Sequence, residues 1–166
     1  MNFIVESERL IIRPFKTADA ESYYQMTQDS LIRKYVPYAC ENSFEKTYET
    51  IEFFYSNGDC VNDFYLILEE KSTHTLIGAL IATATQTSPL TLELCILTDA
   101  NYRRKGFMFE ALSAFIKALP QSTTLLFIVD KKNLASRNTI SKLPGVIEKI
   151  FSEDPKETLY LFSLTT

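Results

Sequence analysis

The apolar positions of the chain follow two different periods, and this predicts a mixed α/β protein. Short runs rich in β-branched and aromatic residues predict strands over residues 3–15, 63–69, 76–85, 91–97, 124–129, 146–151 and 158–162. Helical spacing predicts helices that begin near Thr17 and Ser43, a longer helix from Phe107 to Leu119, and a short one over 135–143. We expect these elements to form one sheet with flanking helices. In the first strand we expect Arg9 and Arg13 to point outward.

The centre of this pattern is a strand, a basic turn and a helix between Thr91 and Leu119. The turn reads Arg103-Arg104-Lys105-Gly106, and the helix follows at once. The first N–H groups of a helix have no intrahelical partner and carry a partial positive charge, so a helix start attracts anions. Gly106 lets a ligand approach the backbone because it has no Cβ. The pattern predicts a polyphosphate site; the alternative is a surface turn whose basic residues are only solvated.

Composition narrows the class of protein. The 166 residues suffice for one domain, 1–166, and 46% hydrophobic with 23% charged residues is typical of a soluble globular chain. We see no membrane-length apolar run and no secretion signal, so we expect a cytoplasmic protein with no membrane partner. Cys40, Cys60 and Cys95 have no metal-ligand spacing, so we expect no metal and reduced thiols. The net charge of −4 disfavours a nucleic-acid binder.

The basic turn and the helix after it resemble the pyrophosphate-binding segment of the GNAT superfamily of acetyltransferases, Arg/Gln-x-x-Gly-x-Gly/Ala. Three more segments are similar to the ribosomal-protein alanine acetyltransferase branch (RimJ/RimL-like): residues 7–15 (SERLIIRPF), 35–38 (YVPY) and 133–138 (NLASRN). The resemblance spans nearly the whole chain. It implies the GNAT acyl-CoA N-acyltransferase fold, an α/β fold whose mostly antiparallel central sheet contains a splayed parallel pair.

The chain departs from the family pattern in three places, and one of them is Ser141 with residues 143–146, where the family has Glu-Lys-x-Gly-Phe. Met108 stands where the pyrophosphate segment usually has a small residue. Ile140 stands where many members carry a tyrosine that protonates the departing thiolate, so that role is vacant here.

The resemblance implies acetyl-CoA as cosubstrate. In the family the pantetheine arm lies along the strand before the basic turn, so a backbone N–H of that strand would face the thioester oxygen. Asn133 would contact the arm from the other side, although it could instead only cap the following helix. The expected cofactor-binding residues are Ile96, Leu97, Thr98, Arg103, Arg104, Lys105, Gly106, Phe107, Met108, Asn133, Ser136 and Asn138.

Glu93 is the candidate general base, since it lies on the cofactor strand and aligns with a glutamate of the branch. It would draw the amine proton through water; alternatively it is half of a buried hydrogen-bonded pair. His74 lies in a predicted hairpin turn and is expected to be exposed, and Cys95 has no base to activate it. Tyr35 and Tyr38 would line the amine pocket, unless they only pack in their loop.

These residues favour an N-acetyltransferase that transfers acetyl directly to a primary amine. Because an α-amine titrates near 8 and lysine near 10.4, a neutral lysine at pH 7 costs about 3 kcal/mol more. An α-amine of a protein or peptide is therefore the expected acceptor. A small-molecule acetyltransferase acting on an antibiotic, polyamine or amino sugar is one alternative, and a non-catalytic acyl-CoA-binding module is another. Monomer and homodimer both stay open.

Overall fold

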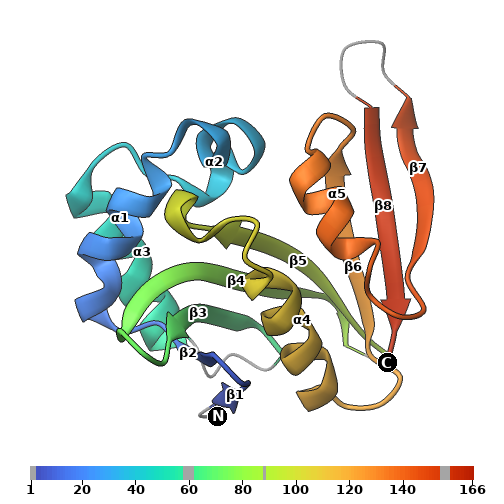
Figure 1. The fold of residues 1–166 in the computed structure, drawn as a ribbon, viewed down its shortest axis with the longest axis horizontal. Helices are drawn as coiled ribbons and strands as arrows, with labels where there is room; N and C mark the ends of the chain where they lie inside the picture. Colours follow the sequence, from blue (N-terminus) through green and yellow to red (C-terminus); the bar gives the residue numbers. More distant parts are fainter. Residues whose placement is uncertain (1–2, 58–61, 88, 154–157) are drawn as a thin grey trace.

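A computed structural model of the protein describes residues 3–57, 62–87, 89–153 and 158–166. One eight-stranded sheet runs through it in the order β1-β2-β3-β4-β5-β6-β8-β7 (Figure 1). The strands are β1 (Val5–Glu6), β2 (Leu10–Pro14), β3 (Phe64–Glu70), β4 (Thr75–Thr87), β5 (Leu90–Thr98), β6 (Thr124–Asp130), β7 (Ile147–Glu153) and β8 (Thr158–Thr165). The helices are α1 (Ala20–Thr27), α2 (Ser30–Tyr35), α3 (Phe44–Asn57), α4 (Phe107–Ala118) and α5 (Leu134–Ile140), with short 3-10 turns η1 (Thr17–Asp19), η2 (Pro37–Ala39) and η3 (Ala100–Tyr102).

One pair of strands in this sheet is parallel. β5 and β6 pair in parallel over three residues, from Thr91 opposite Thr124 to Glu93 opposite Leu126, and all other neighbours pair antiparallel. Beyond Glu93 the two strands diverge (Figure 1). We call the opening between them the wedge, bounded by residues 94–98 of β5 and 127–130 of β6. The expected mixed sheet with a splayed parallel pair is thus confirmed.

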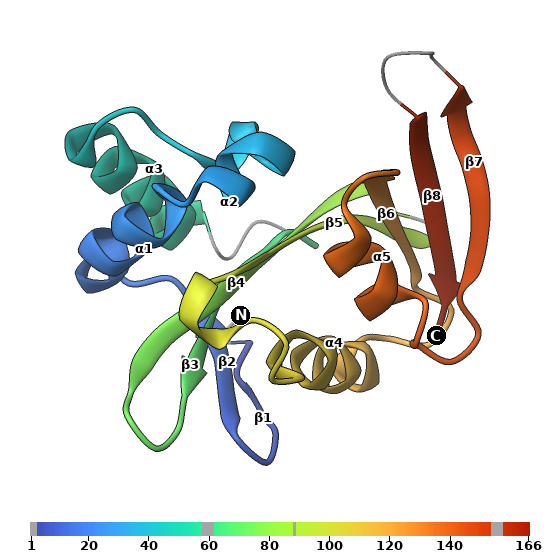
Figure 2. The same ribbon diagram turned by 45° about the horizontal axis from the view of Figure 1, so that its top comes forward.

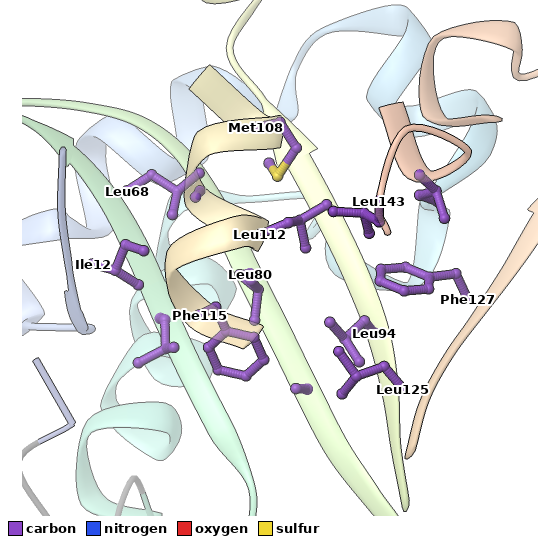
Figure 3. Packing of buried hydrophobic residues seen from close by; sticks show 14 of the residues in the cluster. Ile12, Leu68, Leu80, Leu94, Met108, Leu112, Phe115, Leu125, Phe127 and Leu143 are labelled. Atoms are coloured by element: carbon purple, nitrogen blue, oxygen red, sulfur yellow. The ribbon is translucent and has the colours of Figure 1, made fainter. Parts of the chain in front are cut away.

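The sheet has a hydrophobic core on each face. On one face α4 buries Met108, Leu112 and Phe115, at helical spacing, against β2 to β6 (Figure 3). On the other face α1 to α3 cover β3, β4 and the outer part of β5, with Tyr23 and Ile51 at their centre (Figure 2). Each fully buried side chain of this size contributes about 1.5–3 kcal/mol of transfer free energy.

The structure corrects several expected elements. The single strand over 3–15 is a hairpin of β1 and β2, because Ser7 closes a turn in which its Oγ accepts from the N–H of Leu10 (3.1 Å). The helix α2 was not expected from the sequence; it begins because the Asp29 carboxylate accepts from the first N–H groups of that helix. β4 and β8 extend two and three residues past their expected ends, Thr87 against 85 and Thr165 against 162. Cys60 and the loop at 154–157 lie outside the described residues.

Arg13 is not on the outer surface. Its side chain is only 14% exposed and donates to two carboxylates, to Asp19 at 2.9 Å from both terminal nitrogens and to Glu69 at 2.7 Å from Nε. Asp19 also accepts from the N–H of Lys16 (2.7 Å). This network joins β2 and β3 to the start of α1, at the point where the chain leaves the sheet. Within the described ranges, no helix has the length and hydropathy of a membrane span.

Candidate active site

The wedge exposes backbone groups of β5. Asp99 donates its N–H to the carbonyl of Ile77 on β4 (2.9 Å). Because hydrogen bonding alternates along an antiparallel pair, the backbone groups of Ile96 and Thr98 point away from β4, toward the wedge. The expected strand edge is therefore positioned to offer N–H donors to a ligand.

The start of α4 offers a second group of donors at the end of the same strand. Gly106, in the left-handed conformation (φ +81°), precedes the helix, and Arg104 is also left-handed (φ +61°). The first intrahelical bond runs from the N–H of Glu110 to the carbonyl of Gly106 (3.0 Å), so the N–H groups of the three residues before Glu110 have no such partner. No described side chain caps this helix start. The start of α4 therefore suits the binding of a diphosphate.

A clamp formed by Ser7, Arg9 and Glu110 holds this turn from behind. Glu110 accepts from the Ser7 hydroxyl (2.7 Å), the Arg9 N–H (2.8 Å) and the Arg9 guanidinium (2.7 Å). Arg9 also donates to the carbonyl of Lys105 (3.1 Å) and lies over the ring of Phe107. Sequence reasoning missed this role, because it joins residues about a hundred positions apart. The only signal was the polar SER triplet before an apolar strand.

The three basic residues of the turn have different surroundings. Arg103 donates to Asp29 (2.6 Å) and to the carbonyl of Thr98 (3.2 Å), so its charge is used to fix the start of α2. Lys105 lies over the ring of Tyr102 and does not line the cleft, contrary to expectation. Arg104 is exposed and lines the cleft. Of the three, Arg104 is the cation best placed to meet an anion.

A cleft of about 740 Å³ runs over this helix start, between α2 and α5. Its size suits a small-molecule ligand, since such pockets measure roughly 300–1,000 Å³. The hydroxyl of Tyr35 donates across it to the carbonyl of Lys132 (3.2 Å). Apart from Lys105, all expected cofactor residues line the cleft: Ile96, Leu97, Thr98, Arg103, Arg104, Gly106, Phe107, Met108, Asn133, Ser136 and Asn138.

Asn133 caps α5, as the alternative interpretation held. Its Oδ1 accepts from the N–H of Ser136 (3.2 Å). The residue also lines the cleft, and an amide has two N–H donors besides its oxygen. The capping bond therefore does not exclude contact with a ligand.

A smaller cavity of about 40 Å³ fills the wedge itself. Phe127 and Ile140 line it and belong to the core beneath α4, whereas Cys95 packs with the core on the opposite face. The wedge cavity therefore reaches both faces of the sheet. Tyr38 lines it from η2, and Cys95 lines it from β5.

Glu93 lies on the α1–α3 face, two residues before Cys95 and just before the strands diverge. Its side chain is exposed, so the alternative of a buried hydrogen-bonded pair is wrong. It lines neither cavity, and it stands beside the opening rather than within it.

The remaining nucleophile and base candidates are unsuited to catalysis. Burial, with a smaller contribution from the charges of Cys40 and Glu93, raises the pKa of the Cys95 thiol to about 12, so the thiol stays protonated at neutral pH. His74 is exposed in the β3–β4 turn, contacts Glu69 (2.8 Å) and lines neither cavity. Across the parts of the chain that the structure describes, no group of His, Cys, Asp or Glu is arranged to hold a metal ion.

The clamp gives a prediction for acid stability. Burial would raise the pKa of Glu110, but the hydrogen bonds from Ser7 and Arg9 outweigh it and hold that pKa below the usual value of 4.5. A lowered pKa means that Glu110 stabilises the fold above pH 4.5 and that this stability is lost as the pH falls below it. We expect the urea midpoint to fall less steeply between pH 5 and about 3 in Glu110→Gln than in the wild type. The matched change at the exposed Glu8 should keep the wild-type slope; equal slopes for Glu110→Gln and the wild type would contradict the prediction.

Known proteins resemble this chain in sequence and in fold. A family model described as an acetyltransferase (GNAT) domain matches residues 9–144. An uncharacterized N-acetyltransferase of Bacillus subtilis is 30% identical over 115 residues, which are 68% of this chain and 63% of that relative. The chain thus matches less than two thirds of that relative's length.

Solved structures share the fold at low sequence identity. A ribosomal-protein-S5-alanine acetyltransferase from Vibrio fischeri superposes with a TM-score of 0.79 at 18% identity, covering 99% of this chain and 97% of the other. A putative ribosomal-protein-serine acetyltransferase from Vibrio cholerae gives 0.78 at 20%, over 99% and 98%. A spermidine N-acetyltransferase chimera from Vibrio cholerae and hSSAT gives 0.75 at 14%, over 95% and 96%.

Proposed function

The chain belongs to the GNAT family of acetyltransferases, and from this premise we propose that it moves the acetyl group of acetyl-CoA directly to the α-amine of a protein or peptide. Proteins of this family use acyl-CoA donors. The observation that carries the proposal is the uncapped start of α4 at the end of the splayed strand. One ligand with a diphosphate and an extended arm fits both features.

The residues present fit acetyl-CoA. The diphosphate would accept from the N–H groups at the start of α4, with Arg104 adding charge. The arm would follow the edge of β5 from Thr98 to Ile96, with Asn133 on the opposite wall. When bound, acetyl-CoA supplies an acyl group activated as a thioester. The protein's part is to hold it, to orient the amine and to stabilise charge.

The backbone at Ile96 suits stabilisation of the developing oxyanion. A donor fixed by its strand needs no reorganisation when negative charge forms on the carbonyl oxygen. Glu93 would accept the proton that the amine loses, through water on the α1–α3 face. The departing thiolate would take a proton from solvent.

The proposed acceptor follows from the bases that the site provides. Glu93 is exposed and His74 lines neither cavity, so the amine has to arrive already largely neutral. An α-amine reaches that state at pH 7 for about 3 kcal/mol less than a lysine side chain. The structural neighbours that act on ribosomal proteins support a protein or peptide substrate.

Thiol release from acetyl-CoA in the presence of an amine panel tests this proposal. We expect release with α-amines of short peptides, at higher kcat/KM than with lysine side chains of matched, N-terminally blocked peptides. In Glu93→Gln the same assay should give a lower kcat, by up to about tenfold, with the KM for acetyl-CoA unchanged. A positioned general base contributes about 10²–10⁴-fold, and the loss is smaller here because water carries part of the proton transfer.

Glu49→Gln on α3 is the matched control and should keep wild-type rates, because Glu49 is exposed and lines neither cavity. Binding of acetyl-CoA without thiol release for any amine would favour a non-catalytic binding module. Release with spermidine or aminoglycosides alone would favour a small-molecule enzyme. Equal rates in Glu93→Gln and the wild type would remove Glu93 from the mechanism.

A further inference from the structure

The wedge opens on the α1–α3 face between two apolar side chains. Side chains alternate along β6, and Phe127 and Val129 point into the core beneath α4, so Ile128 between them points to the opposite face. Extending the parallel register by two residues from Glu93 and Leu126 puts Ile128 across the wedge from Cys95. Ile128 is 39% exposed and lines the wedge cavity.

Tyr38 forms the other side of this opening. Tyr38 is 76% exposed, and its backbone belongs to the 3-10 turn η2. An aromatic side chain has only two χ angles, so it offers contact area at a low cost in side-chain entropy. Tyr38 and Ile128 therefore frame the mouth of the cavity, on the face from which the amine would approach.

The lining of the cavity carries little negative charge. Asp130 is the one carboxylate among the described residues that line it, and its Oδ1 already accepts from the N–H of Lys132 (2.6 Å). A polycation would lose hydration at this mouth, and only Asp130, which already accepts one hydrogen bond, and the nearby Glu93 could offset that loss. An acceptor with an apolar group beside its amine would instead bury the exposed apolar surface of Tyr38 and Ile128 under that group.

We propose that Tyr38 and Ile128 select the acceptor, and that it carries an apolar side chain on the carbon bearing the reactive amine. This rests on the proposed function and narrows its acceptor to α-amines next to an apolar side chain. Ile128 and Tyr38 are specificity residues in this proposal and take no part in the transfer of the acetyl group.

The test compares three α-amino amides, glycinamide, alaninamide and leucinamide, which differ only in the side chain beside the amine. With acetyl-CoA, kcat/KM should rise along this series, by about tenfold or more from glycinamide to leucinamide. Ile128→Asn should reduce the leucinamide-to-glycinamide ratio toward one. Tyr38→Ser should do the same; because Tyr38 is largely exposed, this variant keeps the test valid if Ile128→Asn fails to fold.

Ile147→Asn is the matched control. Ile147 is 57% exposed on β7 of the same sheet and lies outside both cavities, so the ratio should stay at the wild-type value. Acetylation of all three amides at equal kcat/KM, or an unchanged ratio in folded Tyr38→Ser, would overturn this inference and leave the proposed function standing. Thiol release with none of the amides or peptides would overturn the proposed function, and this inference with it.

Discussion

Gly106→Ala is expected to weaken coenzyme A binding by roughly thirtyfold. The new methyl group would strain the left-handed turn that sets the position of the N–H donors at the start of α4, and a charge-assisted hydrogen bond lost in this way is worth about 2 kcal/mol. The added Cβ meets only Arg9 Nη2, at 3.6 Å, so the site has room for it. The left-handed φ of +81° strains any L-residue by about 1–2 kcal/mol, and for that reason alanine is a sharper choice than a β-branched residue. Isothermal titration with coenzyme A measures the loss.

Gly145→Ala separates a general loss of stability from the local effect at the start of α4. Gly145 has nearly the same φ, +77°, and its added Cβ would make an ordinary contact with Leu164 at 3.4 Å, outside the cleft. Both variants should lose similar stability, and only Gly106→Ala should lose affinity. Wild-type affinity in folded Gly106→Ala would mean that the diphosphate does not bind at this turn.

Arg13→Met is expected to lower the free energy of unfolding by about 3–5 kcal/mol. It removes the guanidinium from a nearly buried network and leaves Asp19 with only the Lys16 N–H and Glu69 with only His74, although their side chains are only 10% and 12% exposed. The melting temperature should fall by roughly 10 °C or more. Urea or thermal unfolding monitored by circular dichroism measures both quantities.

Two further variants test the cause of this loss. The triple variant Arg13→Met, Asp19→Asn, Glu69→Gln should be more stable than Arg13→Met alone, because it removes the uncompensated negative charge. Arg137→Met should cost far less, since the partner of Arg137, Glu148, is 37% exposed. A loss in Arg13→Met as small as that in Arg137→Met would show that the network is not a major source of stability.

The elements that sequence reasoning found are those whose pattern is local. α4 was predicted because its buried residues, from Phe107 to Phe115, recur at helical spacing and Gly106 marks its start. The short helix α2 was missed because it has six residues, and its clearest signal, the capping carboxylate of Asp29, stands beside an aromatic, proline-broken segment.

The site residues divide in the same way. The helix start after Gly106 follows from a local turn pattern, whereas the strand edge at Ile96 was expected from the family resemblance. The partner of Arg103 lies 74 positions away and that of Ser7 lies 103 away, and no local pattern joins them. The exposure of Glu93 could not be predicted from the sequence either. The apolar pattern of its strand does not reveal that α1 to α3 leave the β5–β6 boundary uncovered on that face of the sheet.

Because the wedge reaches both faces of the sheet, the proposed donor and acceptor would enter from opposite directions. Neither molecule would occupy the volume that the other needs, so both can be present at the same moment. A ternary complex of this kind makes a covalent acyl-protein stage unnecessary, in keeping with a Cys95 thiol that stays protonated. The two products would likewise have separate exits, one on each side of the sheet.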